Sequence, residues 1–250
     1  MRNRLVVFTL VGILAASSAH ATSIVLPDDG GRPGLRQSFG PLGNSANVGL
    51  TEQFRIAADL LTAFAIGDRI NSVGFRLAPD LPTIAYDAVY TRFDIQLSTF
   101  IDQGHGLSRV FDDNLGPDTT LVRSGAMTIP GGSLVNTGGT ANPFYDITFS
   151  QGFAYTGGDL LITIRSKPTD SYSIGLDAVS PAYYPIQTVF SVFDYAKEGS
   201  CCDNLNVPYI RLSTAAVPEP ATWGMAIVGF GAIGCAMRRR RIGGARMLMA

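Results

Sequence analysis

Residues 112–118 place oxygen-bearing side chains at short intervals around a glycine, in the sequence DDNLGPD. Carboxylate and amide oxygens at such spacing, with a glycine for the turn, are what a hard cation such as Ca²⁺ prefers. Asp112, Asn114 and Asp118 are therefore candidate metal ligands, and Ca²⁺ is the one cofactor that the sequence suggests. The glutamate that closes an EF-hand loop is absent, so a polar turn with aspartates accepting backbone hydrogen bonds is the alternative.

The sequence gives less support to a catalytic site than to a metal-binding loop. Residues 22–216 contain one histidine, His105, between two glycines, so a zinc site built mainly from histidines is excluded. No Gly-x-Ser-x-Gly sequence supports a Ser-His-Asp triad. Acids such as Asp94 and Asp113 could hydrolyse a glycoside if a cleft held a pair about 5 to 9.5 Å apart, but acids in loops usually face water. We expect no enzyme activity, with a secreted polysaccharide hydrolase as an alternative.

The cysteines offer a second kind of chemistry. Cys235 lies in an apolar segment and acts there as a small apolar residue. Cys201 and Cys202 are neighbours, and residues 22–216 contain no other cysteine with which either could form an ordinary structural disulfide. Three outcomes remain open: a disulfide between Cys201 and Cys202, bonds to other chains, or free thiols.

The segment that organises the chain lies near its end. It begins with Val217, Pro218, Glu219, Pro220 and, three residues on, Trp223. Each proline fixes its own φ, removes an amide donor and pushes the preceding residue toward extended geometry. An extended backbone is the form that other proteins bind by strand addition, and it is the form that we expect a peptidase to read.

An apolar helix is predicted directly after this turn. Residues 221–237 contain no Asp, Glu, Lys, Arg or His, and about 17 helical residues span about 25 Å, the short limit for a bilayer core. Trp223 stands where an interfacial aromatic belongs. The helix ends at Arg238, Arg239, Arg240 and Arg241. These side chains stay charged and cannot easily cross a membrane, so we expect a transmembrane helix with residues 242–250 as a cytoplasmic tail.

The proline turn, Trp223, the glycine-rich apolar helix and the arginine cluster together resemble the PEP-CTERM sorting signal of Gram-negative bacteria. The resemblance covers residues 217–241, and residues 242–250 extend beyond the point where such signals usually stop. It implies processing by exosortase, a membrane-embedded cysteine protease or transpeptidase. It also implies an association with exopolysaccharide and with a biofilm or floc matrix.

The other end of the chain predicts export. Residues 1–21 have a basic head, an apolar stretch of about 12 residues and an Ala-x-Ala site at Ala19 and Ala21, which are the parts of a secretory signal peptide. The Sec machinery is the expected export partner, and cleavage after Ala21 would leave Thr22 as the mature N-terminus. Residues 22–216, the exported body, carry a net negative charge, so we expect no nucleic-acid partner.

The exported body is expected to be one all-β domain. High Gly and Pro content favours short strands and many turns. Apolar and polar residues alternate in several segments, as half-buried strands require. These segments are residues 70–77, 93–98, 121–129, 144–149, 160–165, 172–176, 189–195 and 209–213. Residues 51–66 fit either one helical face or two strands at 53–56 and 61–66, with strands favoured, and residues 30–49 are predicted as an irregular loop.

This pattern predicts an antiparallel β-sandwich, jelly-roll-like, followed by the single C-terminal transmembrane helix. We expect a non-catalytic protein that is anchored briefly in the membrane and then displayed on the cell surface or released into the matrix. A carbohydrate-binding, lectin-like module is the alternative, with Ca²⁺ at residues 112–118. In that case Tyr183 and Tyr184 could stack on sugar rings, although a packed turn explains them as well.

Overall fold

Strands follow one another through the body with little helix between them. The computed structural model describes residues 21–28, 34–37, 40–43, 48–102, 104, 106–139, 141–172, 174–179, 186–191, 196–199 and 206–214. The strands are β1 (Ser23–Leu26), β2 (Leu35–Gln37), β3 (Leu50–Ile56), β4 (Arg69–Arg76), β5 (Ala88–Thr99), β6 (Thr120–Arg123), β7 (Met127–Ile129), β8 (Phe144–Ala154), β9 (Leu160–Pro168), β10 (Leu176–Val179), β11 (Ile186–Ser191), β12 (Val207–Pro208) and β13 (Ile210–Thr214). Short 3-10 helices form at η1 (Ala58–Leu61) and η2 (Phe111–Asn114).

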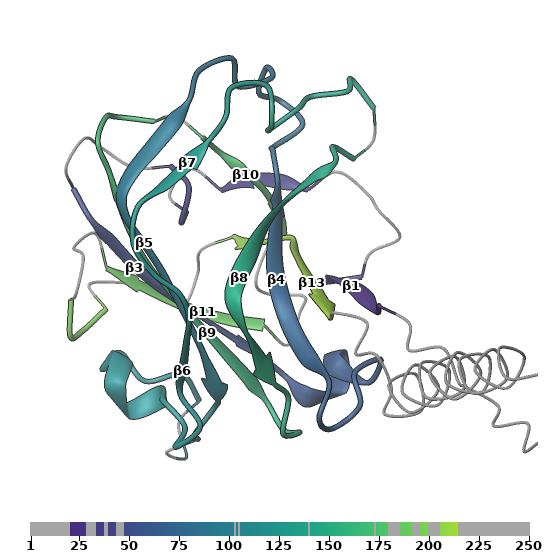
Figure 1. The fold of residues 1–250 in the computed structure, drawn as a ribbon, viewed down its shortest axis with the longest axis vertical. Helices are drawn as coiled ribbons and strands as arrows, with labels where there is room; N and C mark the ends of the chain where they lie inside the picture. The colour runs from purple at the N-terminus through teal and green to yellow at the C-terminus, as the bar shows by residue number, and fades with distance from the viewer. Residues whose placement is uncertain are drawn as a thin grey trace, which may run out of the picture. The chain divides into compact units, whose positions relative to one another are not determined.

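The strands pair into three sheets, and every pairing between named strands of the described residues is antiparallel. A four-stranded sheet has the order β1-β13-β4-β8, and a small sheet has the order β12-β10-β2. The largest sheet has the order β11-β3-β9-β5-β6, with β7 also paired to β5. Figure 1 shows β4 and β8 to the right of β3 and β5. The prediction of an antiparallel all-β body is confirmed.

The four-stranded and largest sheets share one hydrophobic core. Val73 and Phe75 on β4 are fully buried, as are Ile162 and Ile164 on β9. Each pair is separated by one residue, so both members point to the same side of their strand. Burying these two inner faces against each other gives the two-layer arrangement that β-sheets with one apolar face require.

The alternation of apolar and polar residues predicted the positions of the long strands correctly, but it gave wrong predictions where the chain turns. Predicted segments fall within β4, β5, β8 and β9 almost in full. The prediction of a strand over residues 61–66 is wrong, because η1 ends at Leu61 and a turn follows. The prediction of one strand over residues 121–129 is also wrong, because Gly125 has a φ of 92° and separates β6 from β7.

Shorter elements also differ from the predictions. The strand predicted at residues 172–176 is displaced, since β10 begins at Leu176. The strand predicted at 189–195 begins earlier, at Ile186, and residues 192–195 lie outside the described part of the chain. β2 lies within the predicted loop of residues 30–49. The strands β1, β2 and β12 have two to four residues, which is too short for a periodic pattern to reveal.

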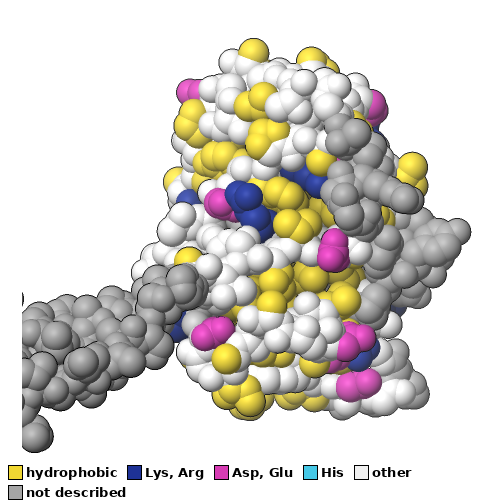
Figure 2. Space-filling model, turned by 90° about the vertical axis from the view of Figure 1, so that its right-hand side faces the viewer, with side chains coloured by type: hydrophobic (Ala, Val, Ile, Leu, Met, Phe, Trp, Pro, Cys, Tyr) yellow, Lys and Arg dark blue, Asp and Glu magenta, His cyan; other side chains and the backbone are white. Residues whose placement is uncertain are grey.

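A surface ion pair lies across β4 at a glycine. Arg211 on β13 and Asp146 on β8 both align with Gly74, and the Arg211 Nε atom donates to Asp146 Oδ1 over 2.9 Å. A Cβ atom on Gly74 would lie 2.3 Å from that oxygen, so the missing side chain leaves room for the pair. Acidic, basic and apolar side chains are interspersed on the face drawn in Figure 2.

Among the described residues, no helix is long and apolar enough to cross a bilayer. Residues 1–20 and 215–250 lie outside the described part of the chain, and these include the helix predicted for residues 221–237. The described strands belong to one compact unit, Ala21–Ala215.

Candidate functional site

The two ends of the exported body lie side by side. Strand β1 pairs with β13 in the register Ser23 to Ser213. Beyond the last pair, the Thr214 amide donates to the Thr22 carbonyl oxygen over 2.8 Å, and the Thr22 amide donates to Thr214 Oγ1 over 3.0 Å. Ala21 is exposed. The predicted mature N-terminus therefore meets the chain two residues before Ala216.

The sorting residues themselves follow directly. Val217, Pro218, Glu219, Pro220 and Trp223 lie outside the described residues, as do Arg238, Arg239, Arg240, Arg241 and Ala19. The structure describes the strand that leads into them. Strand β13 has β1 on one side and β4 on the other, and Ile210 and Leu212 are buried in the core. The sorting segment therefore begins within a few residues of a strand fixed on both sides.

The predicted metal loop has a well-defined hydrogen-bonding role. The Asn114 side chain is fully buried. Its Nδ2 donates to Gln53 Oε1 and to the Ser108 carbonyl, both over 2.8 Å, and its Oδ1 accepts from the Ser108 amide over 2.7 Å. Asn114 thereby holds the loop around η2 over the outer face of β3.

Asp118 fixes the other end of this loop. Its Oδ1 accepts from the Thr99 amide over 2.7 Å, and its Oδ2 accepts from Thr99 Oγ1 over 2.6 Å. Thr156 Oγ1 adds a longer contact of 3.2 Å. Asp112 is exposed on η2. The described residues contain no group of three or more His, Cys, Asp or Glu side chains placed to hold a metal ion.

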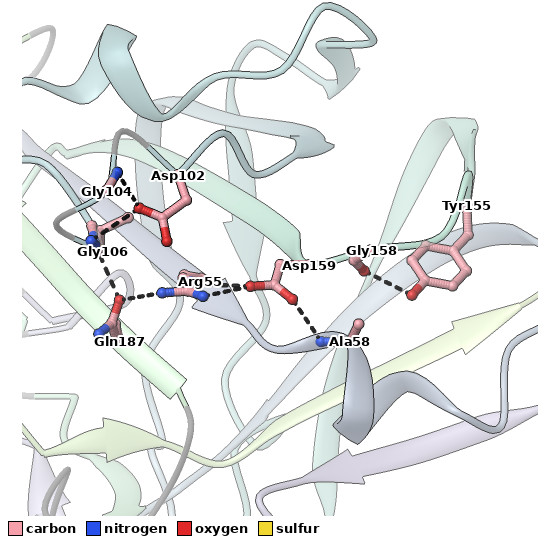
Figure 3. A network of polar contacts seen from close by, with 10 residues as sticks. Arg55, Ala58, Asp102, Gly104, Gly106, Tyr155, Gly158, Asp159 and Gln187 are labelled. Carbon is pink, nitrogen blue, oxygen red and sulfur yellow. Dashed lines mark hydrogen bonds and ion pairs between the residues drawn. The ribbon is translucent and has the colours of Figure 1, made fainter.

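Arg55 is the centre of a polar network that joins separate segments (Figure 3). Its Nε donates to Asp159 Oδ2 over 2.8 Å, and its Nη1 donates to Gln187 Oε1 over 3.0 Å. Asp159 Oδ1 accepts from the Ala58 amide over 2.9 Å, and the guanidinium lies 4.5 Å from the centroid of the Phe100 ring. β3, β11, the turn before β9 and the start of η1 are thus held together.

The same network reaches the loop that carries His105. The Leu107 amide donates to Gln187 Oε1 over 3.2 Å. Asp102 Oδ1 accepts from the amides of Gly104 and Gly106, over 2.7 and 3.1 Å. His105 lies outside the described residues. Asp102 therefore uses one carboxylate oxygen to shape its own loop, a structural task typical of aspartate in turns.

Tyr155 lies next to this polar network, beside Gly158 and Asp159 (Figure 3). Its hydroxyl donates to the Gly158 carbonyl over 2.8 Å. Burial raises the pKa of Tyr155, and the nearby Asp159 carboxylate raises it further, so the phenol keeps its proton at neutral pH. The Arg55 guanidinium compensates the charge of the Asp159 carboxylate. The network is therefore suited to a structural role, in which it fixes the loops that it connects.

The acids considered for hydrolysis lie on different elements. Asp94 is on β5, where its Oδ1 accepts from the Gly125 amide over 2.9 Å and its Oδ2 lies 3.9 Å from Arg92 Nε. Asp113 is exposed on η2, and its Oδ2 lies 3.5 Å from Ser108 Oγ. The structure shows each of them bonded within its own neighbourhood. Cys201, Cys202, Tyr183 and Tyr184 lie outside the described residues.

The titratable group that the sequence analysis missed is Glu52. It is 1% exposed in the middle of β3. Burial raises its pKa from 4.5 to about 8, and a hydrogen bond from Gln37 lowers it by a smaller amount. The signal was present in the sequence: Glu52 occupies the alternate position between Leu50 and Phe54, both of which are apolar.

Comparison with known proteins identifies one segment. The PEP-CTERM protein-sorting motif matches residues 216–241, which contain the proline turn, the apolar run and the arginine cluster described above. The comparison with curated proteins gave no match. The motif implies export, transient anchoring in the membrane and processing by exosortase, a membrane protein. The chain thus carries a β-rich body followed by a PEP-CTERM sorting motif at residues 216–241.

Proposed function

We propose that this chain is a non-catalytic surface or extracellular-matrix protein, sorted by exosortase and associated with exopolysaccharide. The observation that carries the proposal is the sorting motif at residues 216–241, directly after β13. The signal peptide of residues 1–21 directs the chain to the Sec machinery. The body then acts as a jelly-roll-like sandwich held at the membrane by the helix of residues 221–237 until the tail is cut.

Several features support a structural role without a cofactor. The carboxylates of Asp118, Asp159 and Asp102 accept hydrogen bonds that fix loops. Arg55 and Arg76 are matched by Asp159 and Asp177. Loops fixed in this way favour a body that survives outside the cell, where a matrix component must persist.

The test is mass-spectrometric mapping of the C-terminus of protein recovered from cells and medium, with and without an exosortase. We expect loss of residues beyond the proline turn only where the exosortase is present. Protein outside the cell that still carries residues 242–250 would refute the proposal.

Replacing Pro218 and Pro220 together with alanine should abolish most tail processing while leaving export intact. Alanine allows helical geometry at and before both positions, so the extended form is no longer enforced. The fraction of chains with a trimmed C-terminus measures the effect. Pro130→Ala, at an exposed turn of the body, is the matched control and should be trimmed normally. Equal trimming of both variants would show that the extended turn is not what the protease reads.

The exported protein should begin at Thr22. The structure leaves Ala21 exposed and starts β1 at Ser23, so cleavage there removes no strand residue. N-terminal sequencing of the exported protein measures the outcome. An N-terminus that retains Met1 would overturn the signal-peptide prediction, and one beyond Leu26 would mean that β1 is lost from the mature sheet.

A further inference from the structure

The interior of the body holds a carboxyl group among apolar side chains. Glu52 lies on the same face of β3 as Phe54 and Ile56, which are fully buried in the core. Its partner in the register of β9 is Ile164. Gln37, at the end of β2, is 2% exposed and belongs to the small sheet. A polar pair therefore joins two different sheets across the core.

The hydrogen bonds of this pair are incomplete for an ionised glutamate. Gln37 Nε2 donates to Glu52 Oε1 over 3.1 Å. The other oxygen of each group, Glu52 Oε2 and Gln37 Oε1, is buried and has no hydrogen-bond partner among the residues that the structure describes. Both are acceptors when the carboxyl is ionised, so they cannot satisfy each other. Leaving a buried acceptor unpaired is costly, and such groups in native proteins are nearly always bonded.

A single proton resolves both deficits. A carboxylic acid has one O–H donor in addition to its acceptor oxygen. With the proton on Oε2, Glu52 can donate to Gln37 Oε1 while it continues to accept from Gln37 Nε2. The two planar groups then form a ring closed by two hydrogen bonds. The existing hydrogen bond from Gln37 Nε2 to Glu52 Oε1 is kept.

The strands packed around Glu52 supply no compensating charge to its face. The titratable groups to consider are Arg36 on β2, Arg55 on β3, Tyr90, Arg92 and Asp94 on β5, Arg165 and Lys167 on β9, and Asp177 on β10. Arg92 and Asp94 alternate with Phe93 and Ile95, which belong to the core, so they point away from it. β11 and β12 contain no titratable residue. Arg165 and Lys167 alternate with Ile164 and Ser166, so they point to the opposite side of β9 from the core.

The remaining groups are engaged elsewhere. Arg36 and Arg55 form ion pairs with Asp80 and Asp159. Asp177 forms an ion pair with Arg76, and the Tyr90 hydroxyl donates to the Leu42 carbonyl. Among the described residues, an ionised Glu52 would thus be a buried charge without a cation, which a protein avoids by keeping the group neutral.

We propose that Glu52 is a protonated carboxylic acid in the folded protein and forms a cyclic acid–amide pair with Gln37, which ties the small sheet to the largest sheet. Loss of the proton would open the pair and leave a buried carboxylate between the sheets. The acid–amide pair makes the stability of the body depend on pH. This proposal about the pH dependence of stability does not rest on how the tail is sorted.

The direction of the pH effect follows from proton binding. The pKa of Glu52 is about 8 in the folded body against 4.5 for the free side chain. Below the lower value both states hold the proton, and the stabilising effect is fully present. Between the two values unfolding releases one proton, so stability falls as the pH rises, and the loss is complete above about pH 8.

The test compares the wild-type full chain with Glu52→Gln, both in detergent, by urea unfolding from about pH 5 to about pH 9. Glutamine keeps the shape and both hydrogen bonds of the neutral acid but cannot ionise. We expect the folded-to-unfolded ratio of the wild type, relative to the variant, to fall roughly tenfold per pH unit up to about pH 8. Parallel pH profiles for the two proteins would overturn the proposal.

Infrared difference spectroscopy provides a second readout that does not require unfolding. The wild type minus Glu52→Gln should show the carbonyl band of a protonated carboxylic acid near neutral pH, and its absence would also overturn the proposal. Ser166 is the matched control, because its buried Oγ also has no hydrogen-bond partner within the described part of the chain and lies on the same face of β9 as Ile164. Ser166→Ala should leave the band unshifted, whereas Gln37→Leu should shift it. The reverse result would show that the acid bonds to Ser166 instead of Gln37, and would overturn the proposed pair.

Discussion

Replacing Arg76 with methionine is expected to lower the free energy of unfolding by about 3–5 kcal/mol, the usual cost of removing one member of a buried ion pair. Arg76 Nε lies 2.6 Å from Asp177 Oδ2, and the two side chains are 3% and 1% exposed. Methionine fills part of the same volume but leaves a buried carboxylate without the guanidinium that compensates it. The Asp177 carboxylate is also used by the Gly34 amide, which donates to Oδ1 over 2.6 Å.

The position of this pair explains why the effect should be large. Arg76 ends β4 in the four-stranded sheet, whereas Asp177 belongs to β10 in the small sheet. The guanidinium also lies 3.9 Å from the centroid of the Tyr209 ring, and Tyr209 connects β12 to β13. The variant therefore weakens the attachment of one sheet to another rather than a single surface contact.

Arg36→Met is the matched control, measured in the same urea titration. Arg36 and Asp80 are 3.5 Å apart, and their side chains are 41% and 57% exposed. Exposed pairs of this kind contribute about 0–1 kcal/mol, since water and salt screen them. A loss from Arg76→Met no larger than that of the control would show that the buried pair contributes little to stability.

A chain that ends after Asn206 should fail to fold, whereas a chain that ends after Ala216 should fold cooperatively. The shorter chain lacks β12 and β13, and β13 is an interior strand of the four-stranded sheet. Its loss removes the fully buried side chains of Ile210 and Leu212, each worth about 1.5–3 kcal/mol. It also leaves the edges of β1 and β4 without their ladder of hydrogen bonds. Together these losses match the whole stability of a typical domain.

Both chains can be compared by circular dichroism and urea unfolding. The chain ending after Ala216 keeps every described strand and imitates a product cut within the proline turn. If the two chains unfold with the same midpoint, β13 is not required, and the position of the sorting motif directly after it has no structural consequence. If neither folds, residues beyond Ala216 contribute to the body.

The long strands could be predicted because alternation records burial. On the core face, Phe93, Ile95 and Leu97 of β5 and Leu160, Ile162 and Ile164 of β9 recur at every second position. The short strands could not be predicted, since β12 has two residues and pairs only because β10 lies beside it. Residues 61–66 misled the prediction because only two of their apolar side chains pack around a turn, whereas Ile66 is 78% exposed. Leu61 and Phe64 are buried there without belonging to a strand.

The candidate metal loop, residues 112–118, also has contacts that local sequence spacing could not predict. The spacing of Asp112, Asn114 and Asp118 indicated oxygen atoms but not their partners. In the folded body Asn114 bonds to Gln53, and Asp118 bonds to Thr99. Gln53 is 61 residues from Asn114 in the chain, so no local pattern could have revealed that contact.

The sequence by itself was enough to identify the sorting motif of this protein and the β character of its body. Sorting depends on local properties, namely rigid prolines, a continuous apolar run and permanent positive charge, and these need no fold to be recognised. Tertiary structure alone decided that Thr22 meets Thr214, that Arg76 finds Asp177, and that Glu52 is buried beside Gln37. The reason is that the charge state and the partner of a side chain depend on what surrounds it in space, and antiparallel pairing brings together residues that are far apart in the chain.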